Sequence, residues 1–172
     1  MNKKLHYILL HNIGKKVNSN YNPLEEVLAC NDVLTFDGIY LNVYENWDKI
    51  KHKDIILFVM GDYLGKDNSF DKPMPFERYC TQEQILEMQK DGAKIGWHTW
   101  SHPDLTKLSR EEIIKEITPP DWIGLDYFAY PYGKYNQLVK DCVKEVGFKE
   151  AYSVFQTDND HLTIPRDYLC LQ

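Results

Sequence analysis

The segment Val33-Leu34-Thr35-Phe36-Asp37-Gly38 (VLTFDG) joins an apolar, β-favouring run to a carboxylate and a glycine. Branched and aromatic residues in a short run bounded by glycine predict a buried strand. The last residue of such a strand lies on the rim of its sheet, where parallel α/β folds collect their ligands. Asp37 is therefore a candidate reactive group.

Six further short segments have the same apolar character. They are Leu5–Leu10, Ile55–Met60, Ala93–Trp97, Tyr127–Tyr130, Ala151–Phe155 and Leu162–Ile164. Helical patterns separate several of them, because capping boxes begin at Thr81 and Ser109 and a third helix runs from about Asn136 to Gly147. The repeated strand, helix, strand order predicts a parallel α/β sheet, either open or closed into a barrel. A full eightfold barrel typically needs about 250 residues, which is more than this chain has.

Length and composition predict a single domain over residues 1–172, because 43% apolar residues are enough for a substantial core. The net charge of −6 lacks the basic excess of a nucleic-acid binder. No apolar run is long enough to span a bilayer, and the run Tyr7–Leu10 stops at His11, well short of a signal-peptide core. Four cysteines without CxxC spacing indicate reduced thiols, so we expect a cytoplasmic location. The oligomeric state stays open.

The residues that follow the predicted strands carry groups suited to metal-assisted hydrolysis. His11 follows the first strand, Asp37 ends the second, and His98 and His102 follow the fourth. Two histidines at this spacing can converge on one cation when the turn between them is helical. Each residue also has a plainer explanation. A histidine can cap a turn, and a lone aspartate is more often a helix cap or a turn residue.

Three segments, read in order, closely resemble one known family. They are LTFDGIYLNVYEN (34–46), IGWHTWSHPDLTKLS (95–109) and FAYPYGKYN (128–136). The pattern is similar to the polysaccharide deacetylase family, also called the NodB-homology or carbohydrate esterase family 4 domain, from about Asp32 to Arg166. The resemblance implies a distorted, incomplete (β/α) barrel of about seven strands. It also implies an enzyme that uses a divalent metal, commonly zinc, to remove acetyl groups from an N-acetylated sugar or glycan.

The resemblance gives roles to individual residues, with one departure. Asp37 matches the general base, and His98 and His102 match the two histidine ligands of the metal. Gly38 stands where the family has an aspartate as a further ligand. Because catalytic zinc sites typically have three protein ligands, we expect weak metal binding or none. His11 is a candidate replacement ligand, although a hydrogen bond to a loop is the commoner role of such a histidine.

The second and third segments supply the remaining site predictions. Tyr132 resembles the tyrosine whose backbone N–H stabilises the oxyanion, and Trp100, Tyr130 and Pro131 are candidates to contact the sugar. Ala129 occupies the position where many family members carry an arginine that pairs with the base. No residue is assigned as the general acid.

Arg166, in the segment IPRDYL, resembles the terminal strand of the family and has either a structural or a functional role. Three hypotheses remain open at this point. The chain is a metal-dependent amide hydrolase with an altered site, a catalytically weak or inactive carbohydrate-binding relative, or a structural subunit. Fold resemblance alone does not separate them.

Overall fold

Seven parallel strands form the centre of the computed structural model, which describes residues 5–14, 21–69, 76–154 and 157–169. The strands close into a barrel in the order β1, β4, β5, β6, β7, β8, β9. Their bounds are Tyr7–Leu10 (β1), Val33–Asp37 (β4), Ile55–Val59 (β5), Lys94–Trp97 (β6), Tyr127–Ala129 (β7), Glu150–Val154 (β8) and Ile164–Tyr168 (β9). The predicted fold class is confirmed, with one strand fewer than a full eightfold barrel.

The ring closes between its first and last strands, where Ile8 is paired with Asp167 and Leu9 with Tyr168. Strand pairing is sparsest between β6 and β7, where Trp97 and Phe128 form a single residue pair. A barrel with so little pairing at one seam is distorted from a regular cylinder.

The last strand begins later than the predicted segment Leu162–Ile164. Asp160 is the physical reason, because its side chain accepts a hydrogen bond from the Leu162 N–H at 2.8 Å and holds that residue in a turn. The strand then runs from Ile164 to Tyr168 and carries Arg166 into the barrel wall. The end of the predicted strand Ala151–Phe155 lies outside the described residues at Phe155.

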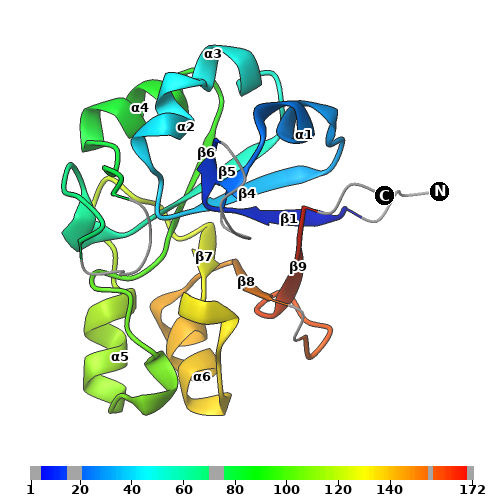
Figure 1. Ribbon diagram of the computed structural model, residues 1–172. Helices are drawn as coiled ribbons and strands as arrows, with labels where there is room; N and C mark the ends of the chain where they lie inside the picture. Colours follow the sequence, from blue (N-terminus) through cyan, green and yellow to red (C-terminus); the bar gives the residue numbers. More distant parts are fainter. Residues whose placement is uncertain (1–4, 15–20, 70–75, 155–156, 170–172) are drawn as a thin grey trace.

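The helices cover two sides of the barrel (Figure 1). Helices α1 (Leu24–Ala29), α2 (Leu41–Glu45), α3 (Trp47–Ile50) and α4 (Gln82–Lys90) lie on one side, and α5 (Arg110–Ile117) and α6 (Gln137–Val146) lie on the other. Both predicted capping boxes are present, at Thr81 before α4 and at Ser109 before α5. Helix α6 is capped by Asn136 and ends at Gly147, whose φ of 102° is left-handed.

Short elements connect the main ones. They are the two-stranded pair β2 (Asn12–Ile13) and β3 (Tyr21–Asn22) and the 3₁₀ turns η1 (Gly61–Tyr63), η2 (Leu105–Lys107) and η3 (Pro131–Gly133). Three of them, β2, η1 and η3, directly follow barrel strands. The predicted loop from Gly61 to Tyr79 contains η1, and its residues 70–75 lie outside the described part.

The strands β4 and β5 are buried along their whole length. Because successive side chains of a strand point to opposite faces, every second residue of β4 faces the barrel interior. Val33 packs there with Phe58 and Tyr152. Asp37 ends the same row of side chains, so its carboxylate lies at the mouth of the barrel interior.

Among the described residues, no helix has the length and apolar character needed to cross a membrane. Cys30, Cys80 and Cys142 are buried free thiols, and Cys170 lies outside the described residues. The cytoplasmic location and the single domain over residues 1–172 stay predictions.

Candidate active site

A cavity of about 440 Å³ lies at the carboxyl ends of the barrel strands. Five predicted site residues line it together: His11, Asp37, His98, His102 and Tyr132. The remaining lining residues are mostly apolar or aromatic. They are Leu9, Tyr40, Met60, Tyr79, Gly133, Val154 and Tyr168. Residues that are far apart in sequence therefore meet in one cleft, as parallel strand ends do in such folds.

The three predicted sugar contacts do not line this cavity. Tyr130 is fully buried, and its hydroxyl donates to the Leu162 carbonyl at 2.9 Å. Pro131 is buried as well. Trp100 packs edge-on against Trp97. The structure places these three side chains outside the cavity lining, and their contact with a sugar stays a prediction.

Besides Tyr132, the aromatic lining comes from residues that the sequence did not single out. Tyr40 and Tyr79 are stacked, with ring centroids 4.4 Å apart and a hydrogen bond of 3.0 Å between their hydroxyls. Met60 packs with this pair. Tyr40 was visible in the quoted segment LTFDGIYLNVYEN, but its position gave no sign of which face it would occupy.

Asp37 is held by a two-point ion pair with Arg166 of β9. The Nη1 atom of Arg166 lies 2.6 Å from Oδ1 of Asp37, and Nη2 lies 2.8 Å from Oδ2. Burial raises the pKa of Asp37, but the charge and hydrogen bonds of Arg166 outweigh this effect and hold the pKa well below its usual range. Asp37 is therefore a carboxylate at neutral pH.

Arg166 has several partners inside the barrel. Its side chain is fully buried and donates to the Thr35 hydroxyl and the Ser153 carbonyl, both at 3.3 Å. The guanidinium carbon also lies 5.4 Å from the centre of the Phe58 ring. Arg166 thus pairs with Asp37 and replaces the arginine that is absent at the position of Ala129. The available signal was the segment IPRDYL, which resembles the terminal strand of the family and contains Arg166.

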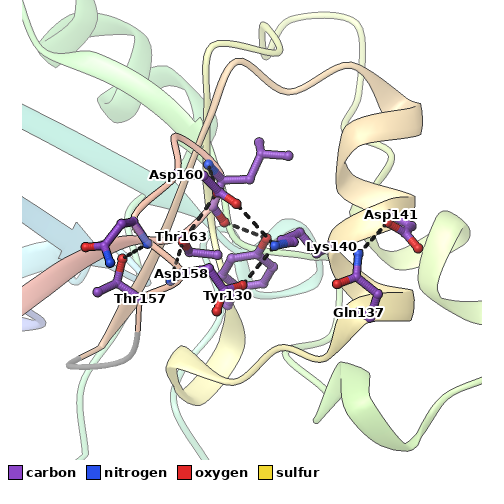
Figure 2. A network of polar contacts seen from close by, with 10 residues as sticks. Tyr130, Gln137, Lys140, Asp141, Thr157, Asp158, Asp160 and Thr163 are labelled. Carbon is purple, nitrogen blue, oxygen red and sulfur yellow. Dashed lines mark hydrogen bonds and ion pairs between the residues drawn. The ribbon is translucent and has the colours of Figure 1, made fainter.

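The segment before β9 is fixed by a polar network that Figure 2 shows from close by. The amine of Lys140 on α6 lies 2.8 Å from a carboxylate oxygen of Asp158 and 3.1 Å from one of Asp160. The Thr163 hydroxyl lies 3.3 Å from Asp160 as well. This network joins α6 to the entry of β9 and so helps to place Arg166.

The two predicted metal-binding histidines lie side by side, with ring centroids 4.8 Å apart. Nδ1 of His98 lies 2.8 Å from the Ala129 carbonyl, which can only accept, so Nδ1 carries the proton. Nε2 of His98 lies 3.6 Å from Oδ2 of Asp37. Burial lowers the pKa of His98 and lowers that of His102 to about 3, so both rings are neutral.

The backbone around the histidines adopts an unusual conformation. Thr99 has a φ of 70° and His102 a φ of 59°, although neither is a glycine. A β-branched residue with positive φ is a true outlier. Tyr132, whose ring centroid lies 4.6 Å from that of His102, has a φ of 58°. Such conformations cluster at functional sites, where the surrounding structure holds them in place.

The donor groups around the cavity decide whether the metal site implied by the resemblance can form. Among residues 5–14, 21–69, 76–154 and 157–169, no three His, Cys, Asp or Glu side chains converge on one metal position. Both oxygens of Asp37 already contact Arg166. Gly38 has no donor side chain, and a Cβ at this position would lie 2.6 Å from the Met60 methyl group. The residues present therefore do not fit a zinc site with three protein ligands.

His11 lines the cavity, and within the described part of the chain it forms no group of three metal-binding side chains, so its role as a replacement ligand stays a prediction. Burial lowers its pKa to about 4. Its Nδ1 atom is buried and has no hydrogen-bond partner within the part of the chain that the structure describes. His11 is a neutral, unsatisfied imidazole facing the site.

The sequence model of the family described as "Polysaccharide deacetylase" matches residues 32–151. An uncharacterised 30.6 kDa protein of Geobacillus stearothermophilus is 36% identical over 133 residues, covering 69% of this chain and 44% of that protein. Chitin deacetylase 1 of Saccharomyces cerevisiae is 40% identical over 72 residues, covering 38% of this chain and 23% of that protein. The chain spans less than half the length of these two curated relatives.

Solved structures share the fold. The Streptococcus pyogenes deacetylase PplD has a TM-score of 0.72 and 17% identity, covering 96% of this chain and 92% of that one. IcaB from Ammonifex degensii has a TM-score of 0.74 and 16% identity, with the same coverage. These structures share the barrel fold, and the family model matches more than half of the residues. The chain belongs to the polysaccharide deacetylase family.

Proposed function

We propose that this protein removes N-acetyl or similar acyl groups from a sugar or polysaccharide, with Asp37 as the general base. The observation that carries the proposal is the buried, ionised Asp37 at the mouth of the barrel, beside two neutral histidines. Family membership supports the reaction class, and relatives are named chitin deacetylase and peptidoglycan-N-acetylmuramic acid deacetylase.

The geometry around Asp37 suits the activation of a water molecule. Oδ2 of Asp37 and the unprotonated Nε2 of His98 face each other at 3.6 Å, and both are hydrogen-bond acceptors. A water molecule in the cavity beside these two atoms can donate one hydrogen to each, which leaves its lone pairs free to attack a bound acyl carbon. Asp37 then takes the proton as the water attacks.

The backbone N–H of Tyr132 is a suitable donor for the developing oxyanion. The neighbouring amides are already used, because Gly133 donates to the Tyr130 carbonyl at 2.9 Å and Lys134 to that of Pro131 at 3.1 Å. A preorganised donor of this kind typically contributes about 10²- to 10³-fold in rate.

Metal dependence stays a prediction from the family resemblance. His98 and His102 are the residues that would hold a divalent ion such as zinc, which supplies Lewis-acid activation of water and carbonyl groups when bound.

A second candidate is a carbohydrate-binding relative with weak or no activity. It is favoured by the lack of a three-ligand metal group among the described residues. The two candidates differ in the release of acetate from N-acetylglucosamine oligomers, measured with chelator and with added zinc. Acetate release in either condition supports the hydrolase. Oligomer binding without acetate release in both conditions supports the binding protein.

A further inference from the structure

The loop that carries His102 is bound by one carboxylate of helix α5. Oε2 of Glu116 accepts hydrogen bonds from the backbone N–H groups of Trp100 (3.1 Å) and Ser101 (2.9 Å). Oε1 accepts from the Ser101 hydroxyl at 2.8 Å. Hydrogen bonds to an ionised carboxylate are stronger than those between neutral groups. One half-buried side chain therefore satisfies three donors of a single loop.

The opposite edge of the same loop is held by backbone groups. The Gly61 N–H donates to the Thr99 carbonyl at 3.1 Å, and the Asp62 N–H donates to the Trp100 carbonyl at 3.0 Å. Gly61 also approaches the Trp100 ring so closely that a Cβ would lie 2.3 Å from it. The carbonyl groups of the loop thus bind η1, and its N–H groups bind Glu116.

This double attachment matters because the loop is strained at both ends. Thr99 and His102 have left-handed φ values of 70° and 59°, which non-glycine residues avoid. The Thr99 hydroxyl accepts from the His102 N–H at 3.0 Å, so the two strained residues are also linked directly. The His102 ring, 4.8 Å from that of His98 and 4.6 Å from that of Tyr132, depends on this backbone conformation.

We propose that Glu116 is a positioning residue of the active site. Acting through the N–H groups of Trp100 and Ser101, it holds the His102 ring against His98 and beside Asp37. The effect on catalysis rests on the proposed function, whereas the effect on the loop does not.

The test compares Glu116→Gln and Glu116→Ala with the control Glu111→Ala, an exposed residue of the same helix. Glutamine has a similar shape but no charge, so its amide oxygen accepts the Trp100 and Ser101 N–H groups more weakly than the carboxylate does. We expect hydrogen exchange of the Trp100 and Ser101 amides to become about tenfold faster or more. We also expect kcat to fall by about tenfold to a hundredfold with KM unchanged.

The His102 ring signals in an NMR spectrum give a readout that loss of stability alone would not move. They should shift or broaden in both Glu116 variants at temperatures where the protein is fully folded, and stay unchanged in Glu111→Ala. If Glu116→Ala does not fold, Ser101→Ala removes one of the three bonds and should show the same changes at smaller size. Amide exchange and His102 signals that match the control would overturn the proposal. A lower melting midpoint of the Glu116 variants, with amide exchange, His102 signals and kcat unchanged, would also overturn the proposal.

If the wild type releases no acetate, the proposed function fails. The exchange and ring measurements still decide the role of Glu116.

Discussion

Replacing Arg166 by methionine should strongly destabilise the protein. Arg166 is fully buried and makes two short hydrogen bonds, 2.6 and 2.8 Å, to the carboxylate of Asp37. Methionine keeps a side chain of similar length beside Phe58 but leaves Asp37 buried without a counter-charge. Breaking a buried ion pair in this way costs about 3–5 kcal/mol. Such a loss is a large part of the roughly 5–15 kcal/mol by which a domain is stable.

The pH dependence of the unfolding free energy should change sign as well. In the wild type the pKa of Asp37 is held below its unfolded value of about 3.9, so between the two values the unfolded chain binds more protons. Stability therefore rises with pH in that window, and the contribution of Asp37 is lost as the pH falls through the folded pKa. Without Arg166, burial raises the pKa of Asp37. Stability should then fall as the pH rises above about 4.

Urea unfolding at a series of pH values measures both effects in the wild type, Arg166→Met, Asp37→Asn and the double variant. Because the double variant contains neither charge, it should be more stable than the sum of the single losses predicts, by about 2 kcal/mol or more. A loss below about 1 kcal/mol in Arg166→Met, or additive losses, would refute the view that this ion pair organises the site.

Two other substitutions give independent checks. Nε2 of His6 lies 2.6 Å from Asp167 and Nδ1 lies 3.3 Å from Asp32, and the bond to Asp167 is the main reason that the pKa of His6 is raised. The stabilising effect of this pair is therefore present below about pH 6.5 and is lost as the pH rises through the raised pKa of His6. Because the pair is half exposed, His6→Gln should lower the unfolding free energy by less than about 1 kcal/mol at low pH. A loss that persists at high pH would contradict this account. Gly38→Asp must adopt a φ of about 60° and displace the Met60 methyl group, so urea unfolding should show a loss of about 1–2 kcal/mol. The same variant should bind zinc more tightly than the wild type in equilibrium dialysis, and equal binding would show that residue 38 is not a ligand position.

Much of the barrel follows from local sequence patterns. The apolar run before Asp37 and the capping boxes at Thr81 and Ser109 depend only on neighbouring residues, and the structure contains them where the sequence predicts. The gathering of Asp37 and the histidines in one cleft also follows, because parallel strands bring their carboxyl ends to the same rim.

The features that sequence analysis missed depend on tertiary contacts. Arg166 meets Asp37 across 129 positions of sequence, and only the closure of β9 onto β1 brings them together. The strand pattern could not tell which tyrosines face the cavity, because side-chain direction becomes irregular where a strand turns into a loop. The structure shows that Tyr130 is buried in the core, whereas Tyr40 lines the site.

The most direct test of the proposed function is the rate of acetate release from N-acetylglucosamine oligomers by the wild type and Asp37→Asn, expressed per folded molecule. Asp121→Asn, at an exposed position, is the matched control. If Asp37 is the general base, the rate should fall by about 10²- to 10⁴-fold in Asp37→Asn and stay unchanged in the control. Acetate release by Asp37→Asn at the wild-type rate would contradict the assignment of Asp37 as the base.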